Sequence, residues 1–261
     1  YSTVSDNKAY GFSYGGGLEL RGTINTISAS TISGNASEGF AGGVDVYSHG
    51  APGGIFQLSN STISGNYAQG MSGLRVDSRT ARFYNSTIAF NTSQYGGPTQ
   101  ASGVQLNLDF NPMSATFEST LISNNTHQSI EDDLGAFFPP GASVTINGGL
   151  VGVPGNNLIR TTSLAGLPTD TRSDCPLLGQ LRDNGGLTKT HALLSHSPAI
   201  DAGNDFFLVP YEQRGAALIN GMRDYLRVSG PIGDLNPKSD IGAHEVQQDD
   251  VVFNTAFEGC G

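Results

Sequence analysis

The sequence predicts an all-β protein: a right-handed parallel β-helix, or solenoid, with a capping region at its C-terminal end. The first observation behind this prediction is a short phrase that recurs five times and ends each time in asparagine. Its copies occupy residues 2–7, 30–35, 61–66, 86–91 and 120–125. The final asparagines are 25 to 34 residues apart. A period of this size is typical of repeats that bury their apolar sides against one another.

The second observation is an odd spacing next to the phrase. In four copies an apolar residue precedes the central isoleucine by five positions, at Ile27, Leu58, Phe83 and Phe117. An odd spacing in a straight strand directs two side chains to opposite faces. Both can reach one core only if the chain turns a corner between them, so each repeat is predicted to contain several short strands.

The third observation is a strict alternation of apolar and polar residues after the first four copies. It covers residues 17–20, 43–46, 73–76 and 103–106, and it predicts a half-buried strand in each repeat. Stacking the repeats in parallel places like residues above one another at about 4.8 Å. Parallel crossovers are overwhelmingly right-handed, which sets the predicted hand of the solenoid.

The asparagines that end the phrase are predicted to hold the corners. Asparagine tolerates the left-handed backbone of a tight turn, and stacked amides can hydrogen-bond to one another as a ladder. We therefore assign structural roles to Asn35, Asn66, Asn91 and Asn125.

The chain is predicted to form one continuous structural unit. Residues 1–160 supply the coils, with a degenerate sixth coil from about 143 to 159; residues 161–246 supply the last coils and the cap, and 247–261 a tail. Residues 130–141 include two prolines after two aromatics and are expected to leave the coil as a loop. Because the sequence begins inside a copy of the phrase, we expect further N-terminal coils in the parent protein, covering strand edges that would otherwise be exposed.

Composition and charge exclude several classes of partner. The net charge is −10 and the isoelectric point is near 4.7, which argues against binding nucleic acid or an anionic membrane surface. No apolar run approaches the roughly 20 residues that span a bilayer. The two cysteines, Cys175 and Cys260, permit a disulfide that ties the C-terminus back to the chain; the alternative is one buried thiol and one in the tail.

The polar positions of the alternating strands are predicted to stack into two columns on one face. The first column holds Glu19, Asp45, Arg75 and Gln105, and the second holds Arg21, Tyr47, Asp77 and Asn107. All eight are candidate binding residues. Carboxylates near 5 Å apart suit a retaining glycosidase pair or a calcium site, which makes Glu19, Asp45, Arg75 and Asp77 the candidate catalytic residues. The alternative, which we favour, is a solvated face in which acids and arginines screen one another.

A second charged group lies near the C-terminus. Asp201, Asp240 and Glu245 are candidate metal ligands, because carboxylate oxygens suit calcium. We favour the alternative that Asp201 and Asp240 accept backbone hydrogen bonds in their turns, while Arg214 pairs with an acid so that a cap closes the solenoid. No cofactor is predicted, with calcium as the one open alternative. No Gly-x-Ser-x-Gly elbow occurs, so a catalytic triad has no support from motifs.

Several C-terminal phrases resemble a known family. They are residues 179–194, 197–204, 213–215 and 240–245, and together with the repeats they look like the choice-of-anchor Q domain family, which comprises secreted or surface bacterial β-helix proteins with polymorphic outer-membrane protein-like repeats. This sequence departs from the family pattern at Glu212 and His244 and by an insert at 216–238. Residues 251–260 are similar to short tails of secreted gammaproteobacterial proteins. The resemblance implies export and a β-helix, and it brings no established catalytic residues.

The sequence therefore favours an exported bacterial module, secreted or at the cell surface, that is structural or binds an extended partner such as a polysaccharide or a surface protein. One alternative is a polysaccharide lyase or glycoside hydrolase acting on the outward polar face. Another is a processed fragment of a larger autotransporter-like protein. Fold alone does not decide between them, because this architecture hosts both binding modules and enzymes.

Overall fold

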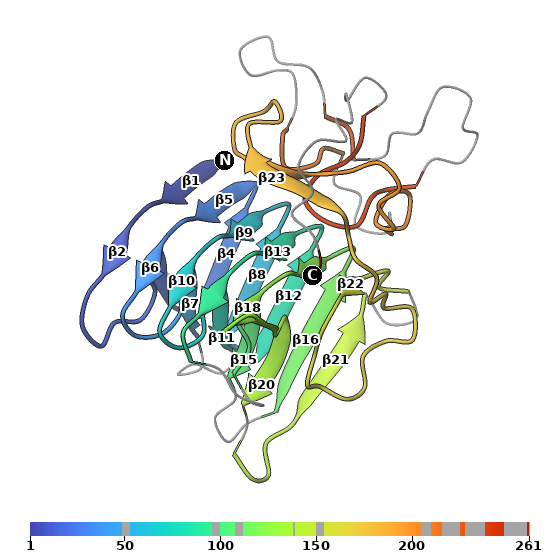
Figure 1. Ribbon diagram of the computed structural model, residues 1–261. Helices are drawn as coiled ribbons and strands as arrows, with labels where there is room; N and C mark the ends of the chain where they lie inside the picture. The colour runs from blue at the N-terminus through green and yellow to red at the C-terminus, as the bar shows by residue number, and fades with distance from the viewer. Residues whose placement is uncertain are drawn as a thin grey trace.

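The computed structural model describes residues 1–48, 53–95, 100–107, 112–137, 139–149, 154–204, 210–215, 225–227, 238–247 and 260. In these ranges every regular element is a β-strand, and four sheets of mainly parallel strands wind into a β-solenoid of about four turns (Figure 1). The predicted all-β parallel solenoid is confirmed. Its hand stays a prediction.

Each coil contributes one strand to each of four sheets, which we number in chain order. Sheet 1 contains β1 (Ser2–Ser5), β5 (Ser30–Ser33), β9 (Thr62–Ser64), β13 (Thr87–Ala89), β17 (Leu121–Ser123) and β22 (Leu158–Ile159). Sheet 2 contains β2 (Lys8–Ala9), β6 (Ala36–Ser37), β10 (Tyr67–Ala68), β14 (Thr92–Ser93) and β18 (Thr126–His127), with the antiparallel β19 (Ile130–Glu131) at its edge.

The other two sheets carry the alternating pattern and the apolar residues before each corner. Sheet 3 contains β3 (Leu18–Arg21), β7 (Val44–Tyr47), β11 (Leu74–Asp77), β15 (Val104–Asn107) and β20 (Leu134–Phe137). Sheet 4 contains β4 (Ile24–Ser28), β8 (Ile55–Ser59), β12 (Thr80–Tyr84), β16 (Met113–Glu118) and β21 (Val144–Gly148).

Left-handed backbone at single residues turns the predicted corners. Between sheets 4 and 1 the corner residues have φ between 45° and 48°, and they are Ala29, Asn60, Asn85, Ser119 and Asn156. The corner between sheets 1 and 2 is likewise turned by residues with positive φ, and they are Asp6, Gly34, Gly65, Phe90 and Asn124. These stand one position before the ladder asparagines, so the expectation that the ladder asparagines themselves adopt the left-handed conformation was wrong.

The ladder asparagines hold the corner through their side chains instead. Asn35 Nδ2 donates to Asn66 Oδ1 at 2.9 Å, Asn66 to Asn91 at 2.9 Å, and Asn91 to Asn125 at 2.8 Å. Each Nδ2 also donates to a backbone carbonyl of an adjacent coil, such as Asn66 to Ile32 at 3.1 Å. Because every one of these buried amides finds donors and acceptors, the predicted ladder stabilises the stack without leaving polar groups unpaired.

An aspartate ends the ladder. Asp133 Oδ1 accepts from the backbone N and Nδ2 of Asn125, at 3.0 and 2.8 Å, and Oδ2 accepts from Thr161 N and Oγ1. A carboxylate offers only acceptors, so it suits the last rung, where donors arrive from both sides. Burial raises the pKa of Asp133 to about 6, opposed by the hydrogen bonds from Asn125 and Thr161.

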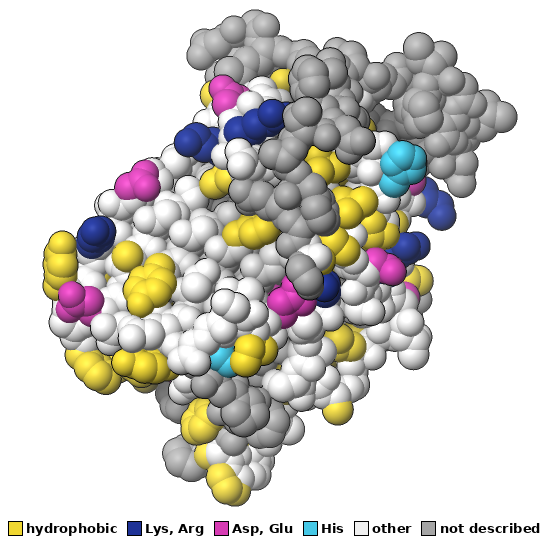
Figure 2. Space-filling view, in the orientation of Figure 1, with side chains coloured by type: hydrophobic (Ala, Val, Ile, Leu, Met, Phe, Trp, Pro, Cys, Tyr) yellow, Lys and Arg dark blue, Asp and Glu magenta, His cyan; other side chains and the backbone are white. Residues whose placement is uncertain are grey.

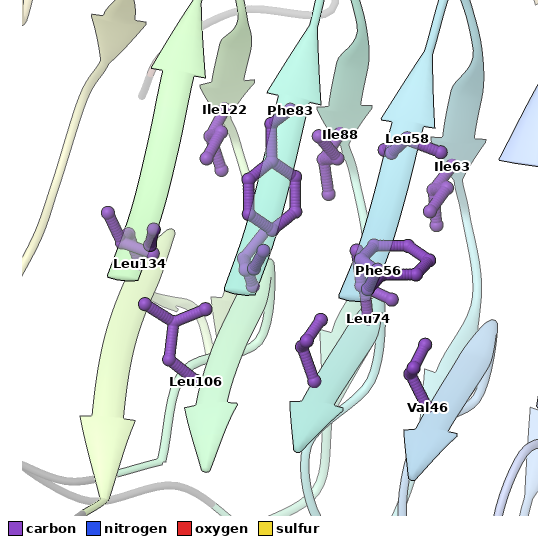
Figure 3. Packing of buried hydrophobic residues seen from close by; sticks show 14 of the residues in the cluster. Val46, Phe56, Leu58, Ile63, Leu74, Phe83, Ile88, Leu106, Ile122 and Leu134 are labelled. Atoms are coloured by element: carbon purple, nitrogen blue, oxygen red, sulfur yellow. The ribbon is translucent and has the colours of Figure 1, made fainter. Parts of the chain in front are cut away.

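The core lies between the four sheets, and its side chains stack coil upon coil (Figure 3). Ile63 and Ile88 point inward from sheet 1, while Phe56 and Phe83 point inward from sheet 4, and all four are fully buried. The Phe83 and Phe117 rings are stacked with centroids 4.5 Å apart. Stacking like on like lets each coil bury the face that a single coil would leave exposed.

One segment that was expected to be a loop belongs in part to the solenoid. Residues 130–137 form β19 and β20, and β20 pairs with β15 in sheet 3. Leu164 and Leu167, which lie outside the strands, also pack against the main core. The prediction of a loop over residues 130–141 was wrong for its first part, because the prolines follow β20.

The C-terminal region adds an antiparallel hairpin of β23 (Leu178–Arg182) and β24 (Thr190–Leu193). A small second core joins its Leu178 and Leu193 to Leu121 and Leu158 of sheet 1. Cys175 and Cys260 form a disulfide with Cα atoms 5.9 Å apart, as the even cysteine count permits. Most of the tail that follows residue 247 lies outside the described residues.

Candidate functional site

The two columns predicted on sheet 3 exist in the predicted order. Glu19 pairs with Asp45, Asp45 with Arg75, and Arg75 with Gln105 across neighbouring parallel strands. The second column pairs in the same register, and its members are Arg21, Tyr47, Asp77 and Asn107. The register follows from the alternating pattern, because a slip by one residue would turn every apolar side chain out of the core.

The centre of this face is buried rather than solvated. Asp45 is 1% exposed and Gln105 is fully buried. Arg75 Nη1 donates to Asp45 Oδ1 at 2.7 Å, the Arg75 guanidinium lies 5.6 Å from the Tyr14 ring centre, and Gln105 Oε1 accepts from Ala101 N at 2.6 Å. Arg75 therefore pairs with Asp45 as expected, but the pair is shielded from solvent by the surrounding residues.

Glu19 and Arg21, at the rim of the sheet 3 face, are more exposed to solvent than its centre. Glu19 forms an ion pair with Arg21, whose guanidinium also lies 5.6 Å from the Tyr47 ring centre. Asp77, in the second column, is buried like Asp45 and is 4% exposed. Burial raises the pKa of Asp45, which the Arg75 guanidinium opposes. Each carboxylate of the proposed glycosidase pair is thus engaged by its own guanidinium.

The candidate metal ligands near the C-terminus act as turn and docking groups. Asp240 Oδ1 accepts from Asp201 N and Oδ2 accepts from Val246 N, each at 2.7 Å, while Glu245 Oε2 accepts from Asp240 N at 2.9 Å. Burial raises the pKa of Asp240 to about 6. Within the described ranges, no three acidic, histidine or cysteine side chains converge as a metal site would require.

Arg214 is the centre of this buried network. It pairs with Glu212, donates to the carbonyls of Asn184 and Glu245, and stacks its guanidinium 4.1 Å from the Tyr225 ring centre. Burial raises the pKa of Glu212 to about 7, against the pull of the adjacent Arg214 guanidinium. The prediction that Arg214 pairs with an acid is confirmed.

The C-terminal region packs against the side of the solenoid, on the outer face of sheet 1. Thr31 Oγ1 donates to Lys189 O, and Thr62 Oγ1 donates to Gln213 Oε1, both at 2.6 Å. Ala243 N donates to Thr87 Oγ1 at 3.0 Å. These contacts cover one threonine in each of three successive coils. Closure of the solenoid end by a cap stays a prediction.

A cleft of about 450 Å³ remains where the hairpin stands over the first coils of sheet 1. We call it the sheet 1 cleft. Figure 1 shows β23 near β1 and β5, the strands of the first two coils of sheet 1. Sheet 1 and its corners contribute Thr3, Ser5, Asp6, Ser33, Gly34, Ser64, Gly65 and Phe90, and the hairpin contributes Gln180, Leu181, Lys189 and His191. Figure 2 shows mostly white surface over β1 and β5, which are strands rich in serine and threonine.

One wall of the sheet 1 cleft holds a serine–histidine contact. Ser64 Oγ lies 2.8 Å from His191 Nε2, and His191 Nδ1 lies 2.7 Å from Gly179 O. The Phe90 ring packs against the imidazole with centroids 5.0 Å apart. Burial lowers the pKa of His191 to about 4, opposed by the hydrogen bond to Gly179, so the ring is neutral above that pH.

Sequence reasoning missed this site. The sequence feature that could have revealed it is the pair of hydroxyl residues on either side of the central isoleucine of the phrase, such as Thr31 and Ser33. Successive residues of a strand point to opposite faces, so these two side chains point outward when the isoleucine points into the core. Nothing local in the sequence says that residues 180–191 return to cover them. Ser64 and His191 are 127 positions apart, and no motif links them.

Comparison with known proteins yields no relative: no protein-family model, curated protein or solved structure matches this chain. The described residues also contain no helix of the length and hydropathy that would cross a bilayer.

Proposed function

We propose that this chain is an exported bacterial binding module that takes a glycan in the sheet 1 cleft. The observation that carries the proposal is the lining of that cleft. It combines hydroxyls from stacked serines and threonines with the Gln180 amide, the Asp6 carboxylate, the Lys189 ammonium and the Phe90 ring. Sugars present dense donors and acceptors beside apolar C–H faces, and this mixture of groups is complementary to both.

Two further observations support export and a bacterial surface role. The Cys175–Cys260 disulfide is of the kind that persists in oxidising compartments outside the cytosol. The resemblance of the C-terminal phrases to secreted β-helix proteins points the same way. The covered state of Asp45 and Asp77 weighs against a lyase or hydrolase that would need those carboxylates open to a polysaccharide.

The first coil supports a place within a larger, autotransporter-like protein. Val4, Leu18 and Leu20 are only partly buried against the core. We propose that a further parallel coil covers this edge in the parent protein, because an open strand edge and half-covered apolar residues are otherwise a site of aggregation.

A glycan panel tests the binding proposal. We expect one or more neutral or acidic oligosaccharides to bind, with affinity reduced about tenfold or more in Asp6→Asn and in Lys189→Met, since each removes a charged hydrogen-bonding group. Asparagine retains the left-handed backbone that Asp6 adopts (φ 60°). The matched control is Glu19→Gln on sheet 3, which should bind as the parent does.

Two results would contradict the binding proposal. A panel without any binding would remove the glycan assignment. Binding lost in Glu19→Gln but kept in Asp6→Asn would move the site to sheet 3.

A further inference from the structure

We propose that Ser64 and His191 form a nucleophile–base pair that cleaves short-chain acyl esters carried by the glycan in the sheet 1 cleft. The identity of the carrier rests on the proposed function. The reactivity of the Ser64–His191 pair rests on its own geometry. Glycan binding and ester cleavage can therefore be disproved separately.

The hydrogen bonds fix which way the proton of Ser64 points. Gly179 O can only accept, so His191 Nδ1, at 2.7 Å, carries the ring proton. A neutral imidazole then presents Nε2 as an acceptor, and Ser64 Oγ, at 2.8 Å, donates to it. A hydroxyl that donates to a base, with the base oriented by a third group, is the arrangement that activates a serine.

Tertiary packing holds the imidazole in this orientation. His191 is paired with Leu181 across the hairpin and is 3% exposed, with the Phe90 ring against it. Ser64 is fixed in β9 between β5 and β13. A base that is already placed and a nucleophile on a rigid strand need little reorganisation before reaction.

The cleft supplies the remaining components of an acyl transfer. Lys189 and Gln180 line the same cavity and offer cationic and amide donors for the negative charge that develops on the ester carbonyl oxygen. The Lys189 backbone carbonyl accepts from Thr31 Oγ1 and Gln213 Nε2, which ties this part of the hairpin to sheet 1.

The proposed step balances with water as the only co-reactant. Ser64 Oγ attacks the carbonyl carbon while its proton passes to His191 Nε2. The ester C–O bond then breaks, the departing alcohol takes that proton, and Ser64 keeps the acyl group. Water, deprotonated by His191 Nε2, attacks the acyl-serine; the carboxylic acid leaves and Ser64 regains its proton.

The repeats provide unusually close controls. Ser33 occupies the same position as Ser64 in the preceding coil and lines the same cleft, while the imidazole hydrogen bond goes to Ser64. In the following coil Ala89 stands at this position and is fully buried. The fold therefore accommodates alanine here, and Ser64→Ala is expected to fold.

The experiment is covalent labelling of the intact chain with a fluorophosphonate probe, read by mass spectrometry of the modified peptide, together with hydrolysis of p-nitrophenyl acetate. We expect one label at Ser64 in the parent and in Ser33→Ala. Ser64→Ala and His191→Gln should lose about a hundredfold or more of the labelling and hydrolysis rates. Circular dichroism and thermal unfolding establish that each variant is folded.

Three results would overturn the proposal: no labelling of the folded parent, equal labelling of Ser33 and Ser64, or undiminished hydrolysis in Ser64→Ala. The glycan panel is run on the same Ser64→Ala protein. Retained glycan binding with lost labelling supports both proposals, whereas glycan binding without any reactivity in the parent removes only this one.

Discussion

The repeating coils and the C-terminal region of this protein are held together by different interactions. In the coils, backbone pairing and a ladder of neutral amides repeat from one turn to the next, and the stacked core contains isoleucine, leucine, valine and phenylalanine. The C-terminal region has one hairpin, one disulfide and a small second core, and its remaining contacts include individual side-chain hydrogen bonds and a buried charge network around Arg214. A repeat distributes its stability over many equivalent contacts, whereas a docked irregular segment depends on a few.

The largest expected effect comes from breaking the charge network. Arg214→Met leaves Glu212 buried without its partner, which should lower the free energy of unfolding by about 3–5 kcal/mol. Denaturant unfolding followed by circular dichroism measures the loss, and limited proteolysis should cut the C-terminal region before the coils. Arg21→Met, at an ion pair on the exposed rim, is the matched control and should leave the unfolding midpoint unchanged. Equal effects of the two variants would contradict the comparison.

The second prediction concerns pH and the end of the ladder. The pKa of Asp133 is raised to about 6 from an unfolded value near 3.9. The folded state therefore holds this proton more tightly, and stability from this group is present below pH 4 and lost as pH rises to about 6. Asp133→Asn does not titrate, so its stability relative to the parent should rise by up to about 3 kcal/mol between pH 4 and 7. A difference that is constant with pH would refute this assignment.

The third prediction tests the ladder itself. Asn91→Ala removes the acceptor of Asn66 N and Nδ2, both buried, and should cost about 2–3 kcal/mol. Asn7 lies at the exposed upstream end of the ladder and donates to Asn35 Oδ1. Asn7→Ala should therefore have a much smaller effect on the unfolding midpoint. Similar losses would mean that the ladder contributes through corner geometry rather than through buried hydrogen bonds.

The smallest expected effect comes from a single docking contact. Thr62→Val keeps the shape but removes the donor to Gln213 Oε1, and should cost about 1 kcal/mol in thermal or denaturant unfolding. Thr3 is the equivalent residue two coils upstream and is exposed, so Thr3→Val should be neutral. An effect of Thr3→Val as large as that of Thr62→Val would show that strand propensity, and not docking, is being measured.

The solenoid could be predicted from the sequence because its information is local and repeated. The alternating stretch from Leu18 to Arg21 fixes which side chains face inward, and its recurrence at Val44–Tyr47 fixes the register of the neighbouring strand. The same logic predicted the columns of sheet 3 and the asparagine ladder. The same reasoning did not predict that Asp45 is buried. Alternation shows which way its side chain points, but it carries no information about the residues that cover it.

What the sequence by itself determined is the architecture: parallel coils, corners between sheets 4 and 1, and a stacked amide ladder, all consequences of side-chain period and hydrogen-bonding capacity. Only the tertiary structure decided that the hairpin and Gln213 return to the outer face of sheet 1, bringing His191 to Ser64 and Gln213 to Thr62. The physical reason is that these contacts join residues more than 120 positions apart through single hydrogen bonds, which leave no period in the sequence.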